Sequence, residues 1–181
     1  MELRKAGLME VLVILVLLIV IIGSGIVSIQ RKLVVMDENI NNAMNQIGVQ
    51  ISSRFDALIA LLEVVENYET LDASLWLEKV KSNRKDIHAK SMPGEASVQE
   101  HIIVEALRFI DGVVRQYPEI KENKAYQKRM GAVDAYERML YTSHLIYNDS
   151  VRKLNQSIRM FPTSWIAGML GFHEREHFET V

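Results

Sequence analysis

The apolar run from Val11 to Ile29 constrains this chain more than any other feature of its sequence. It reads VLVILVLLIVIIGSGIVSI, with fifteen Val, Leu and Ile residues and no charge. At ~1.5 Å per residue it extends about 28 Å, close to the ~30 Å hydrocarbon core of a bilayer. Its insertion is worth at most about −5 to −9 kcal/mol. Core helices of small domains are rarely apolar on every side, so the run predicts a transmembrane helix.

A cleaved signal peptide is the alternative interpretation of this run. Arg4 and Lys5 would form its basic region, and Gly23-Ser24-Gly25 would supply small residues for cleavage. The apolar run is longer than that of an ordinary signal peptide and continues past the small residues as Ile26-Val27-Ser28-Ile29. We therefore expect an uncleaved, single-pass anchor in the lipid bilayer of the cell (inner) membrane.

The charges that flank the run bear on its orientation. Arg4 and Lys5 precede it, and Arg31 and Lys32 follow it, which is a tie under the positive-inside rule. Two acidic residues slightly weaken the N-terminal side. On this basis we expect the domain after the anchor to lie in the cytoplasm.

Composition limits what that domain can do. The chain has 181 residues, a net charge of −2 and no cysteine. The absence of cysteine excludes a disulfide framework, a lipoprotein anchor, thiolate metal sites and cysteine nucleophiles. The small net charge gives no field that would recruit nucleic acid. We divide the chain into a tail and anchor, residues 1–30, and one domain, residues 31–181.

Apolar residues recur in steps of three and four after the anchor, which predicts one long amphipathic helix ending near Tyr68. No proline or glycine pair separates it from the apolar run, so we expect one continuous rod with Gly48 as a mild weak point. The predicted core stripe is Leu33, Met36, Ile40, Met44, Ile47, Ile51, Phe55, Leu58, Leu62 and Val65.

Breaks at residues 91–94, at Pro118 and at Phe161-Pro162 delimit further helices. Ser97 and Glu100 have the spacing of a capping box. The expected helices cover residues 73–88, 97–117 and 123–160. Thr163 or Ser164 can cap a final short turn through Trp165, Ile166 and Leu170. Short connections favour antiparallel neighbours. The predicted fold is all-α: an elongated antiparallel bundle with two long arms and a shorter helical hairpin, in which the last arm returns toward the membrane.

The stretch from Tyr147 to Glu179 resembles the pattern of the LemA family. The matching residues there are Tyr147, Asn148, Asn155, Ile158, Phe161, Pro162, Ile166, Ala167, Gly171, Phe172, Phe178 and Glu179. A first-arm motif matches at Ala43, Gln46, Ile47, Val49, Gln50, Arg54, Asp56 and Leu61, and a third patch at Tyr117, Pro118, Lys121 and Asn123. The chain departs from the pattern at Met44, Gly48, Ser52-Ser53 and Ile59-Ala60.

The resemblance implies a membrane-anchored helical bundle without established catalytic residues. It also suggests association with a membrane zinc metalloprotease of the heat-shock type, and in some relatives a part in shaping specialised bacterial membranes. Accordingly, we expect an adaptor or scaffold that acts by protein contacts and forms homo-oligomers. We expect no catalysis, no cofactor and no nucleic-acid partner.

His173-Glu174-Arg175-Glu176-His177 satisfies the pattern H-E-x-x-H, which opens an alternative from another class. On a helix, His173 and His177 would share a face and could bind zinc, while Glu174 activates water. The chain leaves little helix there and no downstream ligand. A membrane-tethered zinc hydrolase is therefore the less favoured interpretation.

Other polar side chains have ordinary structural interpretations. His144 is expected to be a hydrogen-bonded histidine at the border of the core, and His88 and His101 surface residues. Asn148 and Asn155 flank the last arm's stripe as Gln46, Gln50, Arg54 and Asp56 flank the first, and we expect such groups to bond across the seam and fix its register. A basic cluster is expected to form a solvated face: Lys79, Lys81, Arg84, Lys85 and Lys90.

The segment from Trp165 to Phe172 has two interpretations. The favoured one is a cap that packs over the open end of the bundle. The alternative is contact with the membrane surface or with another copy of the chain, since the returning arm would bring Trp165, Met169 and Leu170 near the headgroups.

Overall fold

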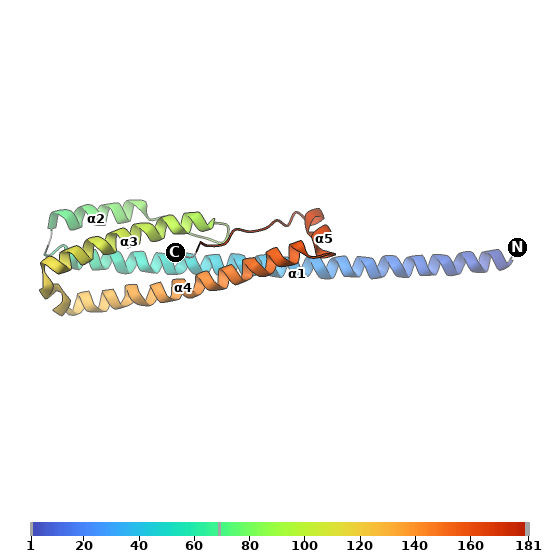
Figure 1. Ribbon diagram of the computed structural model, residues 1–181, viewed down its shortest axis with the longest axis horizontal. Helices are drawn as coiled ribbons and strands as arrows, with labels where there is room; N and C mark the ends of the chain where they lie inside the picture. The colour runs from blue at the N-terminus through green and yellow to red at the C-terminus, as the bar shows by residue number, and fades with distance from the viewer. Residues whose placement is uncertain (1, 69, 180–181) are drawn as a thin grey trace. The chain divides into compact units, whose positions relative to one another are not determined.

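The computed structural model describes residues 2–68 and 70–179, without the side chains of residues 2–9, 70 and 71, so Arg4 and Lys5 lie outside what can be compared. Within these ranges all regular structure is helical, which confirms the predicted all-α class (Figure 1). The helices are α1 (Glu2–Val65), α2 (Thr70–Asn83), α3 (Pro93–Gln116), α4 (Lys124–Arg159) and α5 (Thr163–Leu170), with a 3-10 helix, η1 (Pro118–Glu122).

These helices contribute to two compact units. The first comprises Met1–Glu38 and Arg152–Arg175, and the second comprises Asn39–Val151 and Glu176–Val181. Helices α1 and α4 each supply residues to both units. The predicted continuity of the apolar run with the first arm is confirmed, because α1 is a single helix from Glu2 to Val65.

In the second unit, consecutive helices run in opposite directions, with α2 and α3 as the hairpin between α1 and α4 (Figure 1). Every predicted stripe residue of α1 from Ile40 to Val65 is buried. Each such side chain contributes about 1.5–3 kcal/mol when fully buried, so this stripe contributes substantially to the stability of the unit. The hairpin is held by Trp76, whose ring stacks on Phe109 with centroids 5.7 Å apart.

The ends of α2 and α3 differ from the predicted ones. Helix α2 ends at Asn83 rather than at residue 88, because the buried Gln99 holds the chain that follows it: the Gln99 side chain donates to the Asn83 carbonyl and accepts from the Lys85 amide. Helix α3 begins at Pro93, four residues before the predicted Ser97 cap. The Met92 amide donates to the Glu95 carboxylate at 2.8 Å, so Glu95 takes the role predicted for Glu100.

Gly48 is a close-approach position and not a weak point of α1. It is buried, and a Cβ atom at this position would collide with the carbonyl oxygen of Ile87, in the segment between α2 and α3. Only glycine lets the backbone of this segment pass so near the helix.

In the first unit, the predicted span is exposed from Val11 to Ser28, and Ile29 at its end is half-buried. From Val11 to Ile22, the side chains are between 50% and 69% exposed. Among the described residues, α1 is the one helix long and apolar enough to cross a membrane, and its most apolar window is not buried by the rest of the chain. Leu33, directly after the span, is fully buried, as are Leu154 of α4 and Ala167 of α5.

Gly48→Ala should destabilise the second unit by about 1–3 kcal/mol, because the added methyl group must displace the segment around Ile87. Gly112→Ala in α3 is the matched control, since a Cβ there meets nothing within 4 Å. It should stabilise the chain by about 0.5–1 kcal/mol. Thermal unfolding of the full chain in detergent, followed by circular dichroism, measures both. Equal shifts for the two variants would contradict the close approach at Gly48.

Candidate functional site

The chain beyond α5 is an extended segment, residues 172–179, which we term the C-terminal strap. It begins after Gly171, whose φ of 76° is the left-handed conformation that commonly ends a helix at glycine. The Gly171 amide donates to the Gly168 carbonyl and the Phe172 amide to that of Ala167, which satisfies the end of α5. Beyond Phe172 the strap has no helical hydrogen bonds, so other parts of the chain must satisfy its backbone.

One asparagine of α4 holds the strap in the first unit. The side-chain amide of Asn155 donates to the Arg175 carbonyl and its oxygen accepts from the Arg175 amide, both at 2.9 Å. Asn155 is only 8% exposed. The Arg175 guanidinium lies 3.1 Å from the carboxylate of Asp37 on α1. Both the backbone and the side chain of Arg175 are therefore held.

A second asparagine does the same in the second unit. Asn148 donates to the Phe178 carbonyl at 3.1 Å and accepts from the Phe178 amide at 2.8 Å. The Tyr147 hydroxyl donates to the Glu176 carbonyl at 3.2 Å. The Phe178 ring is buried, stacked on His144 with centroids 4.3 Å apart and edge-on to Tyr147. A side-chain amide that bonds both backbone groups of one residue substitutes for a neighbouring β-strand.

This arrangement corrects the predicted role of Asn148 and Asn155. We expected them to bond across the seam to polar groups of the first arm, but each bonds to the backbone of the strap. The sequence carried a signal that could have indicated this: the two asparagines stand seven residues apart, which is two turns of helix, so they share a face of α4. A non-helical C-terminal segment would need such partners for its backbone.

An ion pair adds to the attachment of the strap in the first unit. The Arg159 guanidinium donates to the Glu174 carboxylate at 2.8 Å. Its hydrogen bonds and charge lower the pKa of Glu174 below the usual glutamate value, and the same pair raises the pKa of Arg159. The pair's contribution to stability is present above the ordinary glutamate pKa and lost as the pH falls through the lowered pKa.

The H-E-x-x-H segment lies in the strap and not on a helix. In an extended chain, residues four apart lie about 13 Å from each other, so His173 and His177 lack the helical spacing that a shared zinc ion requires. Glu174, assigned to activate water in that alternative, bonds to Arg159 instead. Over residues 2–68 and 70–179, no group of three or more His, Cys, Asp or Glu side chains is arranged to hold a metal ion.

His144 lies at the border of the core, as predicted, but its Nε2 atom does not make the predicted hydrogen bond. It is half-buried, its Nε2 atom lies 3.1 Å from the Glu100 carboxylate, and Phe178 covers one face of its ring. Beside it, Arg54 is 3% exposed and lies 3.4 Å from Glu137, so this predicted border residue does bond from α1 to α4. These polar groups link α1 and α3 to α4 beside the Phe178 ring.

The remaining predicted polar residues are at the surface. The Nδ1 atom of His88 shares a hydrogen bond of 2.6 Å with the Ser91 hydroxyl. The Nε2 atom of His101 lies 3.2 Å from the Glu105 carboxylate. Two members of the basic cluster are paired with acidic residues, Lys79 with Glu105 and Arg84 with Asp56. The Lys79 ammonium lowers the pKa of Glu105 through its hydrogen bond and charge. The cluster is therefore partly neutralised.

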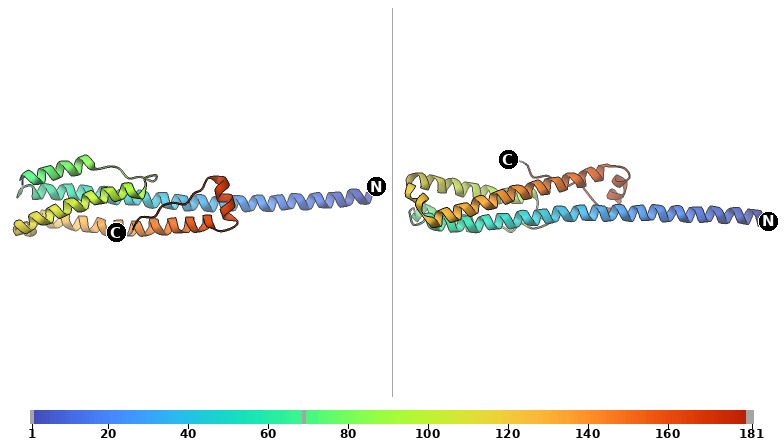
Figure 2. Two further views of the ribbon diagram at one scale, coloured as in Figure 1. Left: turned by 45° about the horizontal axis from the view of Figure 1, so that its top comes forward. Right: turned by 90° about the horizontal axis from the view of Figure 1, so that it is seen from below.

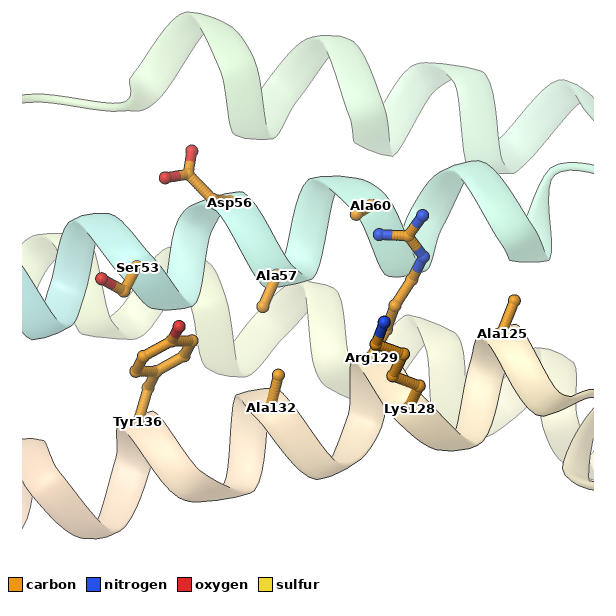
Figure 3. Close-up of a pocket in the computed structure, with 9 residues that line it drawn as sticks. All are labelled: Ser53, Asp56, Ala57, Ala60, Ala125, Lys128, Arg129, Ala132 and Tyr136. Atoms are coloured by element: carbon orange, nitrogen blue, oxygen red, sulfur yellow. The ribbon is translucent and has the colours of Figure 1, made fainter.

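A groove runs between facing stretches of α1 and α4 in the second unit (Figure 3). Small side chains dominate its lining, so the two helices leave room between them. Its residues are Ser53, Asp56, Ala57, Ala60, Ala125, Lys128, Arg129, Ala132 and Tyr136. Ser53 and Ala60 are two of the positions at which the chain departs from the pattern that it resembles. An apolar channel with charged edges suits a ridge of side chains from another helix.

The segment around α5 does not form the packed cap that we favoured. Of its large apolar side chains, those that would have covered the bundle are exposed instead: Trp165 is 79% exposed and Met169 84%. Only the small Ala167 is fully buried within α5. The preceding Phe161 is also 84% exposed.

Comparison with known proteins identifies the family pattern. The model of the LemA family matches residues 43–181. No curated protein matches the chain.

Asn155→Asp should loosen the strap, because a carboxylate cannot donate to the Arg175 carbonyl and instead repels it. The variant should lower the free energy that holds the strap in place by about 1–2 kcal/mol. Trypsin should then cleave after Arg175 roughly tenfold faster. Arg175 is the sole Lys or Arg in the strap, so mass spectrometry identifies this product directly.

The matched control is Asn45→Asp, the same chemical change at an exposed position of α1. It should leave the cleavage rate unchanged. Equal rates for Asn155→Asp and the unaltered chain would contradict the proposed attachment of the strap by Asn155.

Proposed function

The chain belongs to the LemA family, and on that premise we propose that it is a single-pass membrane protein whose helical domain acts as an adaptor or scaffold. In this proposal, residues 11–29 span the bilayer and the domain works through protein contacts, without catalysis and without a cofactor. We place it in the cell (inner) membrane with the domain in the cytoplasm.

The continuity of α1 carries the proposal. The exposed apolar stretch from Val11 to Ile22 and the buried stripe from Ile40 to Val65 belong to one helix. A backbone inside a bilayer must satisfy its own hydrogen bonds, which a helix does. One helix therefore supplies both the proposed span and much of the domain's core, with no break in the helix between them. This arrangement suits a protein that holds partners at a membrane.

The groove between α1 and α4 is the contact surface that we propose for a partner helix (Figure 3). Its small residues allow close approach, and Asp56, Lys128 and Arg129 offer charges of both signs at its edges. A membrane protein, such as the metalloprotease suggested for the family, or a second copy of the chain would supply the helix. Since Ser53 and Ala60 differ from the family pattern, the partner preference of this chain should differ from that of relatives with the usual residues.

A second candidate function is the shaping of membranes by a self-assembling oligomer. The exposed apolar side chains around α5 favour it, because exposed apolar patches on soluble surfaces commonly mark contacts with proteins or membranes. Ordered arrays or tubules on liposomes would distinguish it from an adaptor, which should leave the vesicles round.

Purification of the full chain from native membranes in mild detergent tests the proposal. We expect a stoichiometric membrane protein in the same peak by mass spectrometry, and loss of that partner in the variant Ala60→Trp, which fills the groove. Gly131→Trp is the control: it places the same side chain at an exposed position of α4 with open space around it, and should retain the partner.

Light scattering on the same peak measures the assembly. A chain that elutes alone as a large oligomer would replace the adaptor with the membrane-shaping candidate. A monomer without any partner would contradict both. Co-purified soluble proteins of the non-cytoplasmic side would contradict the proposed orientation.

A further inference from the structure

The chain holds a second apolar segment, from Met160 to Phe172, that the anchor does not explain. Thirteen consecutive residues there carry no charged side chain, and α5 lies within them. A helix that is apolar on all sides needs apolar surroundings on all sides. The surroundings of α5 in the chain supply only part of that.

The two faces of α5 differ in burial. Its inner face is formed by Thr163, Ile166 and Ala167, at the spacing of a helical stripe, and these side chains are half-buried or buried. Its outer face is open. The exposed side chains form what we term the apolar patch: Met160 at 58%, Phe161 at 84%, Trp165 at 79%, Met169 at 84% and Leu170 at 39% exposure.

The position of α5 within the first unit indicates what covers this patch. The unit contains both the span and α5. In Figures 1 and 2, α5 lies beside the light-blue part of α1. The strap secures this placement, because Arg175 lies 3.1 Å from Asp37, a short way along α1.

We propose that the apolar patch inserts into the headgroup and upper acyl region of the same bilayer that α1 crosses. The inference rests on the proposed function, since it requires residues 11–29 to span the membrane. Tryptophan and phenylalanine favour this depth, where their rings are in apolar surroundings and the indole N–H can reach water or lipid oxygen atoms. A short helix with one apolar face outward binds in the plane of the interface.

A lipid surface fits the patch better than a second copy of the chain. The bilayer is next to α5 wherever α1 is inserted, so continuity with the span supplies the apolar surroundings without any further partner. Arg31 and Lys32 are exposed at the same end of the span, where they attract anionic headgroups. The patch thus extends the membrane-bound surface of α1 sideways and fixes how deeply the first unit sits.

The two tryptophans of the chain allow a direct test. Trp76→Phe leaves Trp165 as the sole tryptophan, and Trp165→Phe leaves Trp76, which is partly covered by its stack on Phe109. Each full-length variant is reconstituted into vesicles of phosphatidylcholine with phosphatidylglycerol, with or without bromine on the acyl chains near the headgroup. Flotation and circular dichroism confirm that both variants are inserted and folded.

We expect blue-shifted emission from Trp165 and strong quenching by the brominated lipid, with weaker quenching when the bromine lies at the bilayer centre. Trp76 reports the signal of a tryptophan covered by protein. Water-like, unquenched emission from Trp165 in vesicles that float would overturn the inference and leave the anchor standing. Blue-shifted but unquenched emission would assign the patch to a protein contact. Failure of the chain to float would overturn the proposed span as well.

Discussion

The requirement that a backbone in lipid must bond to itself governs the membrane span that we propose. Inside the hydrocarbon core, water offers no hydrogen bonds, so residues 11–29 can cross only as a helix. The following sequence does not interrupt that helix before its end at Val65: there is no proline before Pro93, and the glycines of α1 stand singly. Along α1 the apolar residues first cover every side of the helix and then, after the span, only one stripe of it. The same helix thereby passes from a stretch that is exposed on all sides to one that is buried along a stripe.

Backbone satisfaction also explains the end of the chain. After Gly171 the strap has neither helix nor strand partners, and asparagine amides of α4 take their place at Arg175 and Phe178. Each amide offers one donor and one acceptor in the geometry of a peptide group. Two side chains of the strap are also held: Glu174 accepts a hydrogen bond from Arg159, and the Phe178 ring stacks on His144. The H-E-x-x-H segment is therefore not helical, and it lacks the helical spacing on which that zinc chemistry depends.

Periodic features were predictable from the sequence, and contacts between distant segments were not. The stripe from Ile40 to Val65, the limits of α4 and the short α5 follow from spacing and from prolines that no neighbour overrides. The end of α2 could not be predicted in this way, because Gln99, which is distant in sequence, bonds to the Asn83 carbonyl. Nor could the close approach at Gly48, which depends on where the backbone of Ile87 passes. Trp165 was misjudged because its apolar character suggested burial in protein, and the structure leaves it open.

The most direct test of the account is extraction of native membranes with alkaline carbonate, which removes peripheral proteins and leaves spanning ones. The full chain should stay in the membrane pellet. The double variant Leu15→Arg and Leu18→Arg places two charges at the centre of the span. Each charge costs about 2.5–3.5 kcal/mol of insertion free energy, so the variant should move to the supernatant. A matched variant with Leu15→Ile and Leu18→Ile should remain in the pellet. Release of the unaltered chain by carbonate would contradict the membrane span on which the account depends.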